Sequence, residues 1–109
     1  MYRGTTPTIT CKFNNEINLD AFDQIWVTFK GSKGIITNEV TLTKDDVVID
    51  NEKQTITFAL TQVQTLKFGS YSKLQCQIRF FIDGDPPEAY ATNIVDLVVK
   101  DILKDGVIS

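Results

Sequence analysis

Residues 73–82 read KLQCQIRFFI, and this stretch decides the fold class. Apolar side chains occupy every second position, and most of the positions between them are polar. The apolar set is Leu74, Cys76, Ile78, Phe80 and Ile82, and the polar set is Lys73, Gln75, Gln77 and Arg79. A period of two is that of a β-strand with one face buried and the other in water. We therefore predict a half-buried strand that begins near Lys73.

The same alternation recurs on both sides of this stretch. Besides 73–82, we expect strands at 8–13, 25–30, 36–42, 47–49, 56–60 and 88–99. Turn-forming residues separate them, at 31–34, 50–53 and 83–87. About seven short strands joined by turns predict an all-β fold, namely an immunoglobulin-like antiparallel β-sandwich. An open β-barrel is the alternative.

Two segments break the alternation. Residues 14–24 fit a single helical turn or a wide loop, since Leu19 and Phe22 are three positions apart after Asn18. Residues 61–68 fit a turn of helix or a crossover.

The length and composition fit one domain. A chain of 109 residues with 42% hydrophobic and 23% charged residues is an ordinary globular protein. We expect a single domain over residues 1–109, with an N-terminal arm at 1–7 and a C-terminal tail at 101–109. The sequence has neither the apolar core of a secretory signal nor a stretch long enough to span a membrane. We therefore expect synthesis in the cytoplasm, where Cys11 and Cys76 stay reduced.

The residue inventory argues against catalysis. Histidine is absent, so the chain has no imidazole base and no Ser-His-Asp or Cys-His pair. Two cysteines alone do not complete a zinc site. Asp83, Asp85 and Glu88 offer oxygen ligands for calcium, but they lack the usual ligand spacing. Carboxylates in turns usually accept bonds from the backbone. We predict no enzymatic activity, no cofactor and no metal.

The charge argues against nucleic acid as a partner. The net charge is −3, and the eleven basic residues are spread along the chain rather than gathered in a patch. Binding to a phosphate backbone needs a basic surface that releases counterions. We therefore predict no nucleic-acid partner, and no membrane partner either.

Trp26 is the first candidate for a functional residue. Cys11, Trp26 and Cys76 follow the order of the Cys-Trp-Cys pattern of immunoglobulin domains, in which the tryptophan packs in the core. In this chain the neighbours of Trp26 in the 25–30 strand form the better inward face. We therefore expect Trp26 to point outward, and the two cysteines to be buried thiols that behave as small hydrophobes.

Phe81 is expected to point outward as well, because Phe80 and Ile82 occupy the inward positions of its strand. Large aromatic side chains outside a core are typical of the apolar centre of a protein interface. The tail after residue 100 is also rich in apolar residues. We therefore predict a protein-binding surface that includes Trp26, Phe81, Ile102, Leu103, Val107 and Ile108.

Four phrases of the sequence resemble a known group of proteins. They are YRGTTPT at 2–8, IWVTFK at 25–30, LTQ with TL within 60–66, and DILKDGVI at 101–108. They resemble a family of small, largely uncharacterised proteins encoded by tailed phages and prophages of Gram-positive bacteria. More distantly, the strand pattern resembles the immunoglobulin-like N-terminal domain of siphophage baseplate upper proteins, which attaches receptor-binding parts to the tail. This resemblance implies a sandwich fold and a place in a virion.

We therefore expect a non-enzymatic structural module that works by protein contacts, made in the host cytoplasm and built into a phage virion as a baseplate, tail or neck component. Its partners would be other copies of the chain or other virion proteins, so we expect a homo-oligomer or a part of a larger assembly. One alternative is a cytoplasmic prophage-encoded module that binds a host protein. A carbohydrate-binding sandwich is the last alternative, for which only Trp26 and Phe81 supply exposed aromatics.

Overall fold

The computed structural model describes residues 1–14, 16–33, 36–68, 73–100, 104 and 106–108. Within them, strands dominate and the helical elements are short. In chain order the elements are β1 (Thr8–Lys12), η1 (Leu19–Ala21), β2 (Gln24–Lys33), β3 (Ile36–Leu42), η2 (Lys44–Asp46), β4 (Val47–Asp50), β5 (Thr55–Ala59), α1 (Gln62–Leu66), β6 (Lys73–Ile82), β7 (Glu88–Ala91) and β8 (Val95–Val98). The two η elements are single 3-10 turns.

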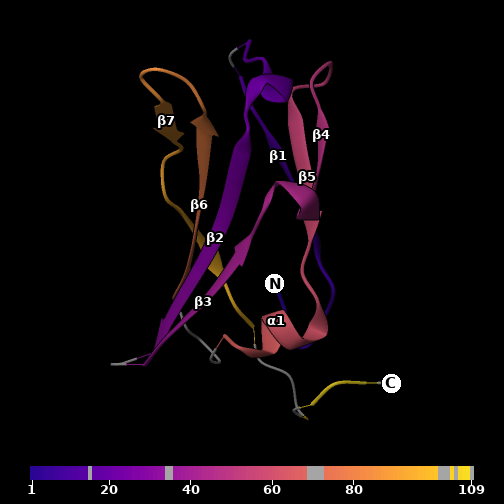
Figure 1. Cartoon of the computed structure of the whole chain (residues 1–109). Helices are drawn as coiled ribbons and strands as arrows, with labels where there is room; N and C mark the ends of the chain where they lie inside the picture. The colour runs from indigo at the N-terminus through magenta and orange to yellow at the C-terminus, as the bar shows by residue number, and fades with distance from the viewer. Residues whose placement is uncertain (15, 34–35, 69–72, 101–103, 105, 109) are drawn as a thin grey trace.

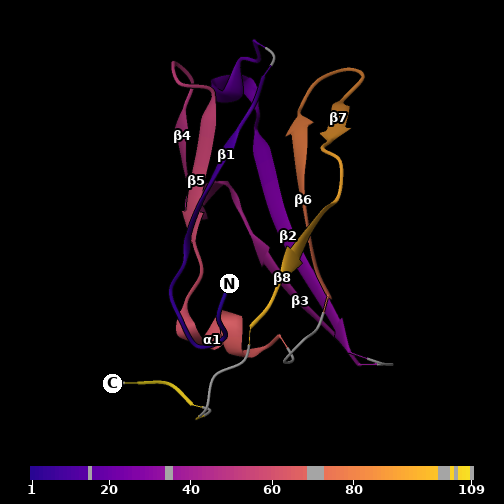
Figure 2. The ribbon, with the colours of Figure 1, turned by 180° about the vertical axis from the view of Figure 1, so that it is seen from behind.

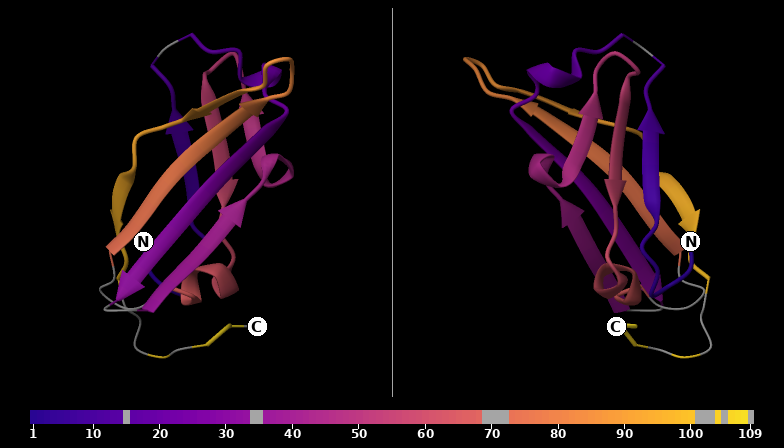
Figure 3. Two further views of the ribbon diagram at one scale, coloured as in Figure 1. Left: turned by 60° about the vertical axis from the view of Figure 1, so that its left-hand side comes forward. Right: turned by 90° about the vertical axis from the view of Figure 1, so that its right-hand side faces the viewer.

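The strands form two antiparallel sheets that face each other (Figure 1). One sheet has the order β1-β5-β4, and the other has the order β3-β2-β6-β7, with β8 also paired to β6. Figure 3 shows that the strands of the two sheets cross at an angle. The predicted all-β antiparallel sandwich is therefore confirmed, and the sheets do not close into a barrel.

The last predicted strand, 88–99, is two strands in the structure. β7 and β8 pair with successive parts of β6, and the chain between them leaves the regular ladder at Thr92. There the backbone N–H of Ile78 donates to Oγ1 of Thr92 at 3.1 Å, while the N–H of Thr92 donates to the Ile78 carbonyl at 2.9 Å. A side-chain hydroxyl thus takes the place of one backbone acceptor, and this substitution divides the strand.

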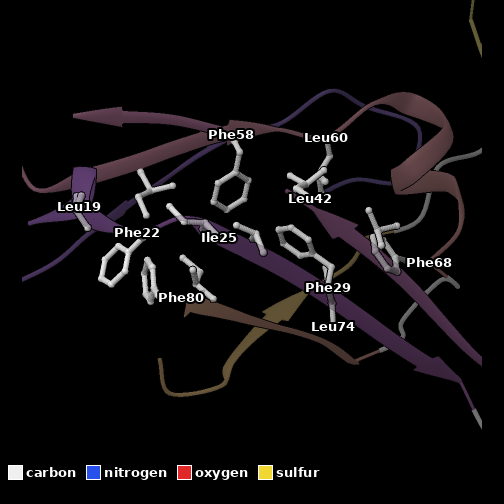
Figure 4. Packing of buried hydrophobic residues seen from close by; sticks show 14 of the residues in the cluster. Leu19, Phe22, Ile25, Phe29, Leu42, Phe58, Leu60, Phe68, Leu74 and Phe80 are labelled. Carbon is white, nitrogen blue, oxygen red and sulfur yellow. The ribbon is translucent and has the colours of Figure 1, made fainter. Parts of the chain in front are cut away.

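The core lies between the two sheets and consists of apolar residues from both (Figure 4). β2 supplies Ile25, Val27 and Phe29, all of which are fully buried. The ring of Phe29 meets that of Phe58 from the opposite sheet edge-on, with 5.7 Å between centroids. This is a favoured geometry for two aromatic rings. The alternation predicted for β2 is therefore the alternation observed.

Gly31 corrects the prediction of a tight turn at 31–34. It lies inside β2 and pairs with Asn38 on one side and Leu74 on the other. A Cβ atom at this position would stand 2.8 Å from Cδ1 of Phe68, whose ring is fully buried. Glycine is needed here because the Phe68 ring packs directly against the β2 backbone. The chain reversal itself, at residues 34–35, lies outside the described residues.

The loop between β1 and β2 is held by the turn that joins β4 to β5. The side-chain amide of Gln54 accepts from the N–H of Ile17 and donates to the Ile17 carbonyl, both at 2.7 Å. Asn51 Oδ1 accepts the N–H of Leu19 at 2.8 Å. Gln54 itself has a φ of 55°, which is uncommon for a residue other than glycine. These bonds place the buried Leu19 over one end of the core.

The N-terminal arm joins the two sheets. The Arg3 N–H donates to the Lys100 carbonyl at 3.0 Å, and the Lys100 N–H donates to the Met1 carbonyl at 2.7 Å, so the arm runs beside the end of the chain that follows β8. The Arg3 side chain donates from Nε to the carbonyl of Phe68 at 2.6 Å and from Nη2 to that of Leu66 at 3.2 Å. A cation thus binds the free carbonyls at the end of α1. The arm then crosses to the other sheet as β1.

Candidate protein interface

Trp26 lies on the outer face of the five-stranded sheet, as predicted. Its side chain is 45% exposed, whereas Ile25 and Val27 on either side of it are fully buried. Cys76, on the neighbouring strand β6, pairs with the inward-facing Phe29. The immunoglobulin pattern of a core tryptophan beside a disulfide is therefore not formed, and both cysteines are free.

Phe81 shares the outer face with Trp26. β2 and β6 are in a register that pairs Trp26 with Arg79 and Gln24 with Phe81. Residues two positions apart on a strand project to the same face of the sheet. Trp26 on β2 and Phe81 on β6 are therefore diagonal neighbours on the outer face. Phe81 is half-buried. Together with Ala89 from β7, these residues line a shallow pocket of about 100 Å³.

Arg79 completes the arrangement. Its guanidinium carbon lies 5.7 Å from the centroid of the Trp26 ring, which is within the range of a cation–π contact. The sequence reasoning did not single out Arg79 or Ala89. The polar period of the 73–82 stretch contained the signal for Arg79, but its contact with Trp26 depends on the register between β2 and β6. We call this surface the Trp26 patch, and it consists of Gln24, Trp26, Arg79, Phe81 and Ala89.

A second hollow, of about 320 Å³, also borders Trp26. Its polar groups come from Asp23, Thr43, Lys44 and Asp45. Three of them are already engaged. Lys44 Nζ donates to the Phe22 carbonyl at 2.6 Å, Asp23 Oδ2 accepts the Asp83 N–H at 2.6 Å, and Thr43 Oγ1 donates to Asp46 Oδ2 at 3.1 Å. Trp26 therefore lines two hollows, and the second has more charged residues around it than the first.

The described apolar residues of the tail do not join the Trp26 patch. Val107 and Ile108 are 56% and 81% exposed, and Ile102 and Leu103 lie outside the described residues. The Ile108 backbone is bound by the Gln62 side chain, which accepts its N–H at 2.8 Å and donates to its carbonyl at 3.1 Å. Gln62 begins α1, at the opposite end of the sandwich from the start of β2 (Figure 1). The described members of the predicted interface thus fall on two separate surfaces, with Trp26 and Phe81 on one and Val107 and Ile108 on the other.

The two thiols line a different feature, a cleft of about 560 Å³ between the borders of the two sheets. We call it the β1 cleft; its apolar lining includes Ile9, Cys11 and Phe13 from β1 and its extension, and Cys76, Val95 and Leu97 from β6 and β8. Both cysteines are half-buried. The prediction that they are fully buried is therefore wrong. Burial raises the pKa of Cys11, and burial together with the nearby Cys11 raises the pKa of Cys76 to about 11. Neither thiol is therefore a ready nucleophile at neutral pH.

In the acidic turn with the candidate calcium ligands, the carboxylates of Asp83 and Glu88 accept hydrogen bonds from nearby groups. Asp83 Oδ1 accepts the Gly84 N–H at 3.0 Å, and Glu88 Oε2 accepts the Tyr90 hydroxyl at 2.7 Å. Among the described residues, no three His, Cys, Asp or Glu side chains gather in a way that would hold a metal ion. No helix in that part of the chain is long and apolar enough to cross a membrane.

The chain matches no protein-family model, and no curated protein is similar to it in sequence. Its functional assignment therefore depends on the residues and surfaces described above.

Proposed function

We propose that this protein is a non-enzymatic interaction module and that the Trp26 patch is the surface with which it binds another protein. The observation that carries the proposal is the exposed Trp26 with the Arg79 guanidinium over its ring and Phe81 beside it. Tryptophan and arginine are enriched among the residues that dominate binding energies at interfaces. A polar rim around an apolar centre is also the usual anatomy of such surfaces.

The patch sets requirements on its partner. Its centre is apolar and nearly flat, since the pocket holds only about 100 Å³. Arg79 is the single charged member of the patch as defined above, so the partner should present an apolar surface with a carboxylate that reaches the guanidinium. A sugar fits less well, because Arg79 already occupies the position over the Trp26 ring where a sugar would stack. A folded protein is therefore the partner that the patch favours.

We propose further that this partner is another component of a phage virion, in the baseplate, tail or neck. This step relies on the phrases at 2–8, 25–30, 60–66 and 101–108 that resemble small phage and prophage proteins. The exposed Trp26 belongs to the second of these phrases. A structural part that holds its place by protein contacts needs neither a cofactor nor a catalytic group.

The proposal is tested in phage particles that carry Trp26→Ala or, as a matched control, Val48→Ala. Val48 is also an exposed apolar residue, at 69%, but it lies on β4 of the other sheet. We expect mass spectrometry of purified virions to find the wild-type and Val48→Ala proteins at equal amounts and Trp26→Ala at less than about a tenth, a loss typical of a residue that dominates an interface. Thermal melts of the isolated variants would show that both are folded.

Two results would count against the proposal in different ways. Absence of the wild-type protein from purified virions would contradict the virion role. Equal incorporation of Trp26→Ala and wild type would contradict the Trp26 patch as the docking surface.

A further inference from the structure

Among the residues that the structure describes, no strand pairs with one of the two edges of β1. β1 forms the border of its sheet, in which the order is β1-β5-β4. Leu60 donates to the Pro7 carbonyl and Phe13 donates to the Gln54 carbonyl, so odd-numbered residues of this stretch direct their backbone groups to β5. In an antiparallel ladder this direction alternates. Thr8, Thr10 and Lys12 therefore direct their N–H and C=O groups away from the sheet.

The side of the sandwich next to this edge is incompletely covered. The inward residues Ile9 and Cys11 are only half-buried, while Ile56 and Phe58 on the adjacent β5 are 0% and 3% exposed. The β1 cleft opens here, lined by residues of β1 on one sheet and of β8 on the other. Figure 2 shows where these two strands run. An apolar cleft beside a row of unpaired backbone groups has the chemistry of a site for one additional strand.

We propose that the strand that fills this site is β1 of a second copy of the chain, so that two copies associate about a two-fold axis through Thr10. An antiparallel register centred on Thr10 places Thr10 opposite Thr10 and Thr8 opposite Lys12 of the other copy. This register pairs all three outward residues of each strand, and a shift in either direction leaves some of them unpaired. It also places no like charges opposite each other, since each Lys12 faces a threonine.

The inward side of the same pairing supplies the missing cover. With Thr10 on the axis, Ile9 of each copy stands opposite Cys11 of the other. The apolar side chains of the added strand then project toward the side of the sheet on which the β1 cleft lies. The interface is isologous, so it closes with two copies and leaves neither β1 edge free. It uses the three-stranded sheet and is independent of the Trp26 patch on the other sheet.

The opposing expectation is that Lys12 and the short length of β1 keep the edge solvated, as in many monomeric β proteins. The experiment that decides between them is light scattering after gel filtration, together with sedimentation over a range of protein concentrations. We expect a reversible dimer for the wild-type chain. A monomer up to the highest soluble concentration would overturn the proposal.

Thr10→Pro and Thr10→Ala form a matched pair. Both lose the hydroxyl contact with Thr57, which is 3.2 Å in the wild type, but only proline removes the outward N–H. The two-fold pairing loses two backbone bonds with proline, so we expect a dissociation constant at least about tenfold higher than that of Thr10→Ala. Equal dissociation constants would contradict pairing through β1. Melting curves of the two variants check that each remains folded.

Charge substitutions test the identity of the occupant. Thr10→Asp alone and Thr10→Lys alone place two like charges across the axis, and each should be monomeric. An equimolar mixture places opposite charges there and should recover the dimer. If Thr10→Asp and Thr10→Lys each still form the dimer that the wild type forms, the copies associate through another surface. Two monomeric variants that fail to associate when mixed would show that Thr10 does not face Thr10.

Discussion

Replacement of Gly31 by alanine tests how closely β2 packs against Phe68, which lies just after α1. The new Cβ would lie 2.8 Å from Cδ1 of Phe68 and 3.6 Å from Cε1. Phe68 is fully buried, so a shift of its ring would disturb the core around it. Overpacking of this kind costs about 1 to 3 kcal/mol, and the lower entropy of alanine in the unfolded chain offsets about 0.4 to 1 kcal/mol.

We therefore expect Gly31→Ala to lower the free energy of unfolding by about 1 to 2 kcal/mol. For a domain of this size the melting temperature should fall by roughly 4 to 15 °C. Gly84→Ala is the control, because its nearest contact would be the Pro86 carbonyl oxygen at an ordinary 3.5 Å. That substitution should change stability by less than about 0.5 kcal/mol.

A double-mutant cycle identifies the clash as the cause. Phe68→Leu removes part of the ring, so alanine at position 31 should cost less in that background, with a coupling of at least about 0.5 kcal/mol. A melting temperature for Gly31→Ala equal to that of the wild type or of Gly84→Ala would contradict the clash with Phe68. The same cost with leucine at position 68 would contradict it as well.

Three further perturbations follow from contacts described above. Arg3→Ala should lower the free energy of unfolding, measured by urea denaturation, by about 1 to 3 kcal/mol, because charge-assisted bonds to the carbonyls at the end of α1 are lost. Arg3→Lys, which lacks the guanidinium fork, should recover only part of this lost stability. Gln54→Ala should lower it by about 1 to 2 kcal/mol, since both backbone groups of Ile17 lose a partner; an unchanged urea midpoint would contradict this. The pKa of Cys76 is raised from 9.0 to about 11, so the rate of its alkylation should keep rising up to about pH 11. The free energy of unfolding should fall between pH 9 and 11, because the unfolded chain loses the thiol proton at a lower pH than the folded chain. A rate that levels off near pH 9 would indicate an ordinary thiol.

The fold class was predictable because alternation is a local property. In β2 and β6, the face of each residue follows from its neighbours. The structure confirms the alternation most clearly in β2, where Ile25, Val27 and Phe29 are buried and Trp26 is exposed. Gly31 was assigned to a turn because glycine is common there. Its actual reason is a contact with Phe68, which is far away in the sequence and leaves no local signal.

The residues of the proposed interface were predictable only in part. Trp26 and Phe81 were identified because each breaks the expected polarity of an outer strand face. Arg79 was missed because the pairing of Trp26 with Arg79 depends on the register between two strands. The free edge of β1 was missed for a similar reason, since alternation shows which side of a strand is buried but not which strand lies at a border.

The docking of the N-terminal arm has a consequence for the timing of folding. The Met1 ammonium donates to the Val98 carbonyl at 3.0 Å, across 97 residues of chain. At a synthesis rate of roughly 5 to 20 residues per second, the arm waits about 5 to 20 seconds before its partner exists. The three-stranded sheet, by contrast, has all its strands by residue 59. One layer can thus form while the chain is still growing, and the arm can join the two layers only after Lys100 has been added.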